Sequence, residues 1–164
     1  MINETILLFI MIGIGGTIAL DIWALLIFKL LGQPGTNWAM VGRWIGHMKS
    51  GQFIQPNLAH SAKIPGELAI GWIAHYIIGI TFALLLYIFF GEQWIQQSAI
   101  LPPLIIAWIS IAAPFFIMMP GMGAGIAGAK LPTPTIAKIK SVAGHTVFGL
   151  GMFITSQAFN SSVM

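Results

Sequence analysis

Asp21 is the residue whose chemistry differs most from its surroundings in this chain of 164 residues. It lies inside the apolar stretch 5–31, where a carboxylate costs about 2.5 to 3.5 kcal/mol to insert into a membrane. A carboxylate in such a place is usually paired or functional. We therefore treat Asp21 as a candidate ligand-binding residue. The competing interpretation is a structural carboxylate that is hydrogen-bonded or protonated.

Two histidines occur in similar apolar stretches, His75 within residues 68–90 and His145 within residues 141–159. Small residues at helical spacing accompany all three polar side chains: Gly13 and Thr17 with Asp21, Gly71, Gly79 and Ala83 with His75, and Ser141 and Gly149 with His145. Stripes of small residues let helices approach closely, so we expect the three side chains to face other helices rather than lipid. At 1.5 Å per residue they lie at comparable depths near the cytoplasmic side.

An aspartate and two histidines at one depth suit either of two chemistries. They could ligate a divalent metal such as zinc, with His47, His60 or water as the fourth ligand. They could also relay protons. Because no close ligand spacing such as H-E-x-x-H is present, structural hydrogen bonding between helices competes with both.

Arg43, which lies in the long stretch 32–67, is a further candidate ligand-binding residue. A guanidinium group binds phosphate well, so a lipid headgroup is the expected ligand.

The composition determines which elements must position these residues. Hydrophobic residues make up 57% of the chain and charged residues 7%, whereas a soluble domain is about 25% charged. Four apolar segments are long enough to cross about 30 Å of hydrocarbon: residues 5–31, 68–90, 100–119 and 141–159. We predict an all-α, polytopic membrane protein, a single domain over residues 1–164 built as a four-helix transmembrane bundle. The first segment is too long for a signal peptide and lacks a basic start, so we expect it to be retained.

The basic residues predict the orientation of this bundle. All seven would lie on one side of a chain that crosses four times: Lys29, Arg43, Lys49, Lys63, Lys130, Lys138 and Lys140. The positive-inside rule then places loops 32–67 and 120–140 in the cytoplasm and both termini outside. Despite the net charge of +3, these residues are too few and scattered to bind nucleic acid.

The first cytoplasmic loop contains the signature of a short helix. Thr36 or Asn37 is a suitable N-cap, and the residues that follow place apolar side chains on one face and Arg43 on the other. We predict that this helix lies along the inner membrane surface, with Trp38 and Trp44 at the depth of the headgroups.

The third apolar segment ends in an unusual run of glycines. Pro114 is expected to kink the helix. Gly123, Gly125 and Gly128 spell G-x-G-x-x-G, but this motif indicates dinucleotide binding only between a strand and a helix. We favour close helix packing through Gly121 and Gly125 over a broken helix end that lines a cytoplasmic cavity.

Several motifs along nearly the whole chain are specific enough to compare with known proteins. They are Asp21-Ile22-Trp23-Ala24, Asn37-Trp38-Ala39-Met40-Val41-Gly42-Arg43-Trp44, Gly71-Trp72-Ile73-Ala74-His75-Tyr76, Ala113-Pro114-Phe115-Phe116, Pro120-Gly121-Met122-Gly123-Ala124-Gly125 and Gly144-His145 with Phe148-Gly149. On these motifs the chain resembles a family of small bacterial inner-membrane proteins classified as a domain of unknown function. The resemblance implies a bacterial inner-membrane protein of four helices and brings no reaction, substrate or cofactor with it.

Taken together, these features predict a non-enzymatic bacterial inner-membrane protein that supports cell-envelope integrity, assembly or division. Its partners would be the lipid bilayer and envelope or division proteins, and its intramembrane Asp/His site would bind a cation or small ligand. The sequence carries no catalytic signature, which favours a non-enzyme without excluding an enzyme. One alternative is a proton or metal-ion transporter, which would act as a homo-oligomer because four helices are few to enclose a path. A second alternative is a membrane-embedded lipid-binding module or enzyme.

Overall fold

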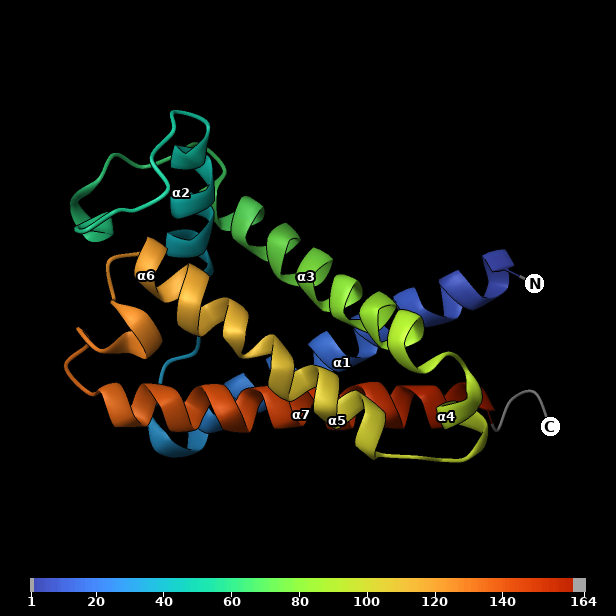
Figure 1. Cartoon of the computed structure of the whole chain (residues 1–164). Coiled ribbons are helices and arrows are strands. Elements are labelled where there is room, and N and C mark those ends of the chain that lie inside the picture. The colour runs from blue at the N-terminus through green and yellow to red at the C-terminus, as the bar shows by residue number, and fades with distance from the viewer. Residues whose placement is uncertain (1, 161–164) are drawn as a thin grey trace. The chain divides into compact units, whose positions relative to one another are not determined.

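The computed structural model describes residues 2–160 and the side chains of residues 4–159. In this part of the chain every regular element is helical (Figure 1). The elements are α1 (Ile2–Leu31), α2 (Trp38–Met48), η1 (Leu58–His60), α3 (Glu67–Phe90), α4 (Gln93–Gln96), α5 (Leu101–Ser110), η2 (Pro114–Met118), α6 (Met119–Gly121), η3 (Ile126–Gly128) and α7 (Pro134–Asn160). The all-α prediction is confirmed.

Three helical stretches are long and apolar enough to cross a membrane: Glu4–Leu31, Glu67–Phe90 and Leu101–Gly121. They match three of the four predicted segments. The fourth, residues 141–159, lies inside α7, which has 27 residues but falls short of the apolarity of the other three within the described residues. Polar residues such as His145, Thr146 and Gln157 interrupt its apolar side chains. The chain therefore has the helices of a membrane protein, and the four-span bundle is not confirmed.

The described residues form two compact units. Unit 1 comprises the residues up to Gly35, Tyr76–Ser110 and the residues from Ala143 onward, and unit 2 comprises Thr36–His75 and Ile111–Val142. The boundary falls inside α3 and inside α7.

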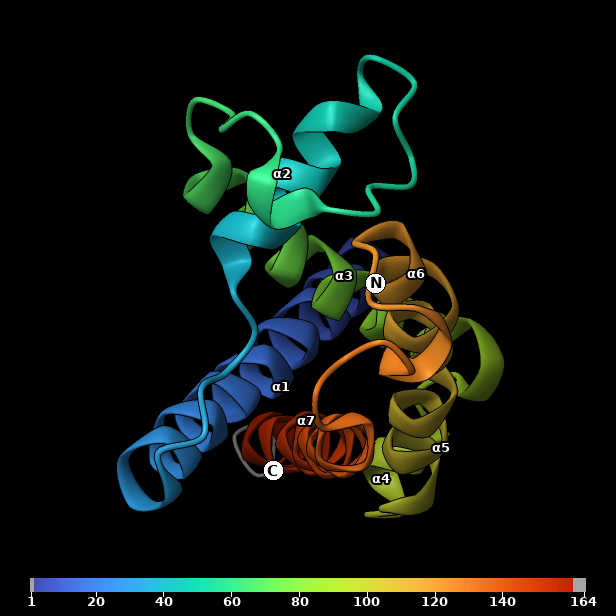
Figure 2. The same cartoon turned by 90° about the vertical axis from the view of Figure 1, so that its left-hand side faces the viewer.

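Unit 1 is held together by glycines at which helices meet. A Cβ atom added to Gly13 of α1 would lie 2.7 Å from the Cα of Ile80 in α3, and one added to Gly149 of α7 would lie 3.0 Å from the Cβ of Ala107 in α5. A Cβ added to Gly16 of α1 would lie 2.7 Å from a side-chain atom of α7. Figure 2 shows α7 nearly end-on beside α1 and α5. The buried cluster of this unit consists of Phe9, Ile12, Ala83, Leu86, Trp94, Ile95, Ile106, Ala107, Phe148 and Met152.

Unit 2 is organised around α2. The side chain of Asn37 caps this helix by accepting a hydrogen bond from the backbone N–H of Met40 at 3.2 Å, as we predicted. Every residue of α2 is buried or half-buried. Trp44 is 7% exposed, and its indole N–H donates to the carbonyl of Phe53 at 2.8 Å. We expected Trp44 at headgroup depth on a surface helix; in the structure its ring is part of the packed interior of unit 2.

The third apolar segment is interrupted where Pro114 was expected to kink it. Proline lacks the N–H of the regular helical ladder, and the five residues from Pro114 form a π-helical segment between α5 and α6. α6 then ends at Gly121, which packs against the ring of Trp44 as predicted for a glycine in a close contact. Gly125 has a different role, because its φ of +74° favours glycine. Its conformation belongs to the turn beyond the helix rather than to helix packing.

Candidate functional site

Asp21 is hydrogen-bonded across two membrane-type helices. The hydroxyl of Tyr76 in α3 donates to Oδ2 of Asp21 in α1 at 2.9 Å, and both side chains are half-buried in unit 1. Two glycines let α1 and α3 approach closely enough for this hydrogen bond. A Cβ on Gly13 would touch the α3 backbone, and one on Gly79 would overlap the hydroxyl of Thr17. The predicted face of Gly13, Thr17 and Asp21 therefore does point at a neighbouring helix.

His145 lies at the same level of unit 1 as Asp21. Its neighbour Gly144 approaches Leu20, the neighbour of Asp21, with 3.1 Å between an added Cβ and the leucine methyl carbon. His145 is half-buried. The next residue, Thr146, accepts a hydrogen bond from the indole N–H of Trp108 at 3.0 Å. This stretch of α7 is thus tied to both α1 and α5.

His75 belongs to unit 2 and to an aromatic cluster. Its ring is stacked on that of Trp38, with centroids 4.0 Å apart and planes at 27°, and meets the ring of Trp72 edge-on at 5.7 Å. The residue is 8% exposed. Consecutive residues of an α-helix point about 100° apart, because one turn takes 3.6 residues. This rotation explains why Tyr76 serves Asp21 while His75 packs against tryptophan.

The structure gives no support to the metal site predicted from Asp21, His75 and His145. Among the described residues, no three His, Cys, Asp or Glu side chains are grouped so that they could hold a metal ion. The hydrogen-bonding interpretation explains the Asp21 contact better, because its observed partner is a phenol hydroxyl.

Arg43 has a protein partner in unit 2. Its Nε and one terminal nitrogen donate to the two carboxylate oxygens of Glu67, each at 2.8 Å, and the other terminal nitrogen donates to the carbonyl of Ala59 at 3.4 Å. The side chains of Arg43 and Glu67 are 8% and 15% exposed. Glu67 also accepts from the N–H of Ile64 at 3.1 Å. The hydrogen bond to Glu67 raises the pKa of Arg43 above its ordinary value, so the guanidinium stays charged.

This ion pair changes the expected role of Arg43. We expected a lipid phosphate as its ligand, whereas in the structure its donors are directed at Glu67 and Ala59. A bidentate arginine–carboxylate pair fixes geometry as well as charge. Arg43 therefore joins α2 to the start of α3.

Two glycines make this junction close enough for the ion pair. A Cβ on Gly42 of α2 would overlap the carbonyl oxygen of Glu67, and one on Gly71 of α3 would overlap the carbonyl oxygen of Trp38. Both obstacles are backbone atoms, which cannot move aside as a side chain can. The α2–α3 junction thus depends on the absence of a side chain at both positions.

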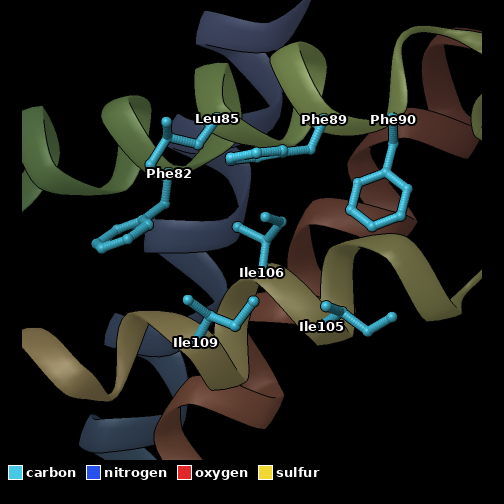
Figure 3. A pocket seen from close by; sticks show the side chains of 7 residues that line it. All are labelled: Phe82, Leu85, Phe89, Phe90, Ile105, Ile106 and Ile109. Atoms are coloured by element: carbon cyan, nitrogen blue, oxygen red, sulfur yellow. The ribbon is translucent and has the colours of Figure 1, made fainter.

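An apolar groove of about 350 Å³ lies between α3 and α5 in unit 1. Figure 3 shows the side chains that line it, which are all hydrocarbon. They are Phe82, Leu85, Phe89, Phe90, Ile105, Ile106 and Ile109. Such a groove packs against other hydrocarbon and provides no group for acid–base or binding chemistry.

Sequence reasoning missed two of the partners described here. Tyr76 was recognised only as part of a motif, although a phenol next to a candidate histidine is a possible donor to a membrane carboxylate. Glu67 was not considered as a partner of Arg43, although it is the one acidic residue in the stretch 32–67 that contains Arg43.

Residues 10–159 match the family described as a protein of unknown function (DUF2938). The match covers most of the chain, so the chain belongs to this family. Neither a curated protein nor a solved structure matches it.

Proposed function

We propose that this family member is a non-enzymatic protein of the bacterial inner membrane that supports cell-envelope integrity, assembly or division through a polar site inside the membrane. The observation that carries the proposal is the 2.9 Å hydrogen bond between Tyr76 and Asp21. It joins two helices that are long and apolar enough to span a bilayer. A carboxylate between two such helices is costly and is usually paired or functional.

The partner of the carboxylate suggests what the site takes up. The Tyr76 hydroxyl donates to one oxygen of this carboxylate, and a carboxylate can also accept a proton or bind a cation. His145, at the same level of unit 1, adds an imidazole, whose ring nitrogens can donate or accept a proton. A carboxylate and an imidazole at one level suit a proton or a small cation, which is the ligand class that we propose.

The length and packing of α7 support a chain that crosses the membrane four times, with residues 141–159 as the fourth span. This helix has 27 residues, and Cβ atoms on its Gly149 and Gly151 would contact Ala107 of α5 and Ala19 of α1. The charge distribution supports the orientation. Unit 2 holds six of the seven basic residues and one of the four acidic residues. A basic unit on the cytoplasmic side follows the positive-inside rule. Four crossings then place both termini in the periplasm.

Single cysteines test this topology cleanly, because the chain contains no cysteine. A membrane-impermeant maleimide should label Gln97→Cys in intact spheroplasts and should label Lys63→Cys only after permeabilisation. Both positions are exposed, so the substitutions should not disturb the fold. A reporter enzyme that is active only in the periplasm, fused after the C-terminus, should be active. Reversed labelling, or an inactive reporter on a stable fusion, would contradict the four-span arrangement.

The functional claim is tested in cells that lack the gene. Such cells should leak a periplasmic marker enzyme under osmotic or detergent stress, and the wild-type chain should restore retention. Asp21→Asn should lose most of this effect, whereas Tyr76→Phe should lose less, because the carboxylate remains. Thr81→Val is the matched control, since the Thr81 hydroxyl bonds only to the carbonyl of Ile77 in its own helix.

The transport alternative gives a different result with the same variants. Purified wild-type protein in liposomes would carry a proton or cation flux above that of empty liposomes, and Asp21→Asn would abolish it. That outcome would replace the envelope proposal by transport. We expect wild-type liposomes to be as tight as empty ones.

A further inference from the structure

Two large apolar side chains project from unit 2 outside the candidate membrane spans. Phe53 is 61% and Ile54 is 70% exposed, and we call this pair the apolar tip. The backbone on both sides of the pair is tied inward. The carbonyl of Phe53 accepts from the indole of Trp44 at 2.8 Å, and the N–H of Gln55 donates to the carbonyl of Gly121 at 2.7 Å.

These contacts hold the loop in place while leaving the two side chains outside. Gln55 is only 8% exposed, and its side chain bonds to that of Gln52 at 2.8 Å. On the other side of the loop, a Cβ on Gly123 would lie 2.6 Å from the carbonyl oxygen of Gln55. These backbone contacts give the loop a defined conformation. The apolar tip is thus presented by a fixed part of unit 2.

The charged residues of unit 2 indicate what the apolar tip meets. Lys49, just before the loop, and Lys130, in the turn after α6, are exposed, and Ile126 of that turn is 61% exposed. The acidic residue of this unit, Glu67, is bonded to Arg43. Lys49 lies four residues before Phe53, and the N–H of Lys130 donates to the carbonyl of Ala124, the neighbour of the Gly123 that approaches Gln55. Exposed apolar side chains and lysines in one part of a unit are complementary to a bilayer surface with anionic headgroups, where each basic residue contributes about 1 kcal/mol.

We propose that the apolar tip is a membrane-surface anchor, in which Phe53 and Ile54 insert into the headgroup layer of the surrounding bilayer and Lys49 and Lys130 bind anionic lipids. The anchor replaces the role that we first expected of Trp44, which is buried. It goes beyond the envelope function and is independent of Asp21. An acidic protein partner is the competing occupant, and it makes a different prediction.

Labelling the apolar tip tests the anchor in the full-length protein. A fluorophore is attached to Ile54→Cys, and the protein is placed in nanodiscs of phosphatidylcholine with or without phosphatidylglycerol. A nitroxide carried by the lipid should quench this label strongly in the anionic discs and weakly in the neutral ones. The same label on Ala62→Cys, an exposed position of the same unit, is the control and should be quenched less.

Removing the two lysines should release the anchor without unfolding unit 2. In the double variant Lys49→Gln/Lys130→Gln, the ratio of inserted to free tip in anionic discs should fall by about 30-fold, as two basic contacts of about 1 kcal/mol each imply. Equal lipid quenching at positions 54 and 62, or quenching that is the same in neutral and anionic discs, would overturn the proposal. A label at position 54 that is shielded from both lipid-borne and aqueous quenchers would indicate a protein partner instead.

Discussion

Replacing Gly42 by alanine is expected to destabilise unit 2 by about 3 kcal/mol, at the upper end of what overpacking costs. The added methyl group would overlap the carbonyl oxygen of Glu67, which is a backbone atom and cannot rotate away. Gly71→Ala should have a similar effect through the carbonyl of Trp38. Denaturant or thermal unfolding in nanodiscs measures the loss.

Gly35→Ala is the matched control for this prediction. A Cβ added to Gly35 would lie 3.5 Å from the Cβ of Ala24, which is ordinary van der Waals contact. Because Gly42 and Gly71 belong to one junction, the double variant should lose less stability than the two single losses added together. If Gly42→Ala unfolded at the same point as Gly35→Ala, the close α2–α3 junction would be refuted.

Replacing Arg43 by methionine is expected to lower the amount of folded protein in membranes several-fold, because Glu67 would be left without its partner. Glu67→Met should have a comparable effect, since it leaves the buried guanidinium of Arg43 without its carboxylate partner. The double variant Arg43→Met/Glu67→Met should recover much of the loss, because no charge is then left unpaired. Quantitative blotting together with thermal unfolding of the purified protein measures these effects.

A conservative variant separates geometry from charge at this ion pair. Arg43→Lys keeps the charge but cannot bind both carboxylate oxygens in the same fork. The amount of folded Arg43→Lys protein should therefore lie between the amounts of the wild type and of Arg43→Met. Lys138→Met, which removes an exposed basic residue of the same unit, should leave the amount unchanged. Single variants at Arg43 and Glu67 that behave like Lys138→Met would show that the pair contributes nothing.

Hydrophobic patterning and capping chemistry were sufficient to predict much of the fold. The three apolar spans, the helix capped by Asn37 and the interruption at Pro114 each follow from local chemistry that a few neighbouring residues contain. The helix face that presents Asp21 also followed from spacing alone, because residues four apart share a face.

The missing parts depend on contacts between residues distant in sequence. Arg43 and Glu67 are 24 positions apart, and Asp21 and Tyr76 are 55 apart, so no local pattern pairs them. Tryptophan is a residue type that is common at membrane surfaces, and the contacts of Trp44 with Phe53 and Gly121 show that this one is buried. The fourth span is not confirmed for a local reason, because polar residues lower the mean hydropathy of α7 below that of the other three helices.

The comparison of Asp21→Asn with the wild type in gene-deleted cells tests the central claim most directly. Asparagine has nearly the same shape as aspartate, and its amide oxygen can still accept from the Tyr76 hydroxyl, so the two proteins are compared at equal folded amounts measured by blotting. At equal amounts, we predict that Asp21→Asn cells leak the periplasmic marker nearly as much as cells without the gene. Full retention of the marker by Asp21→Asn would contradict a functional polar site in this membrane protein.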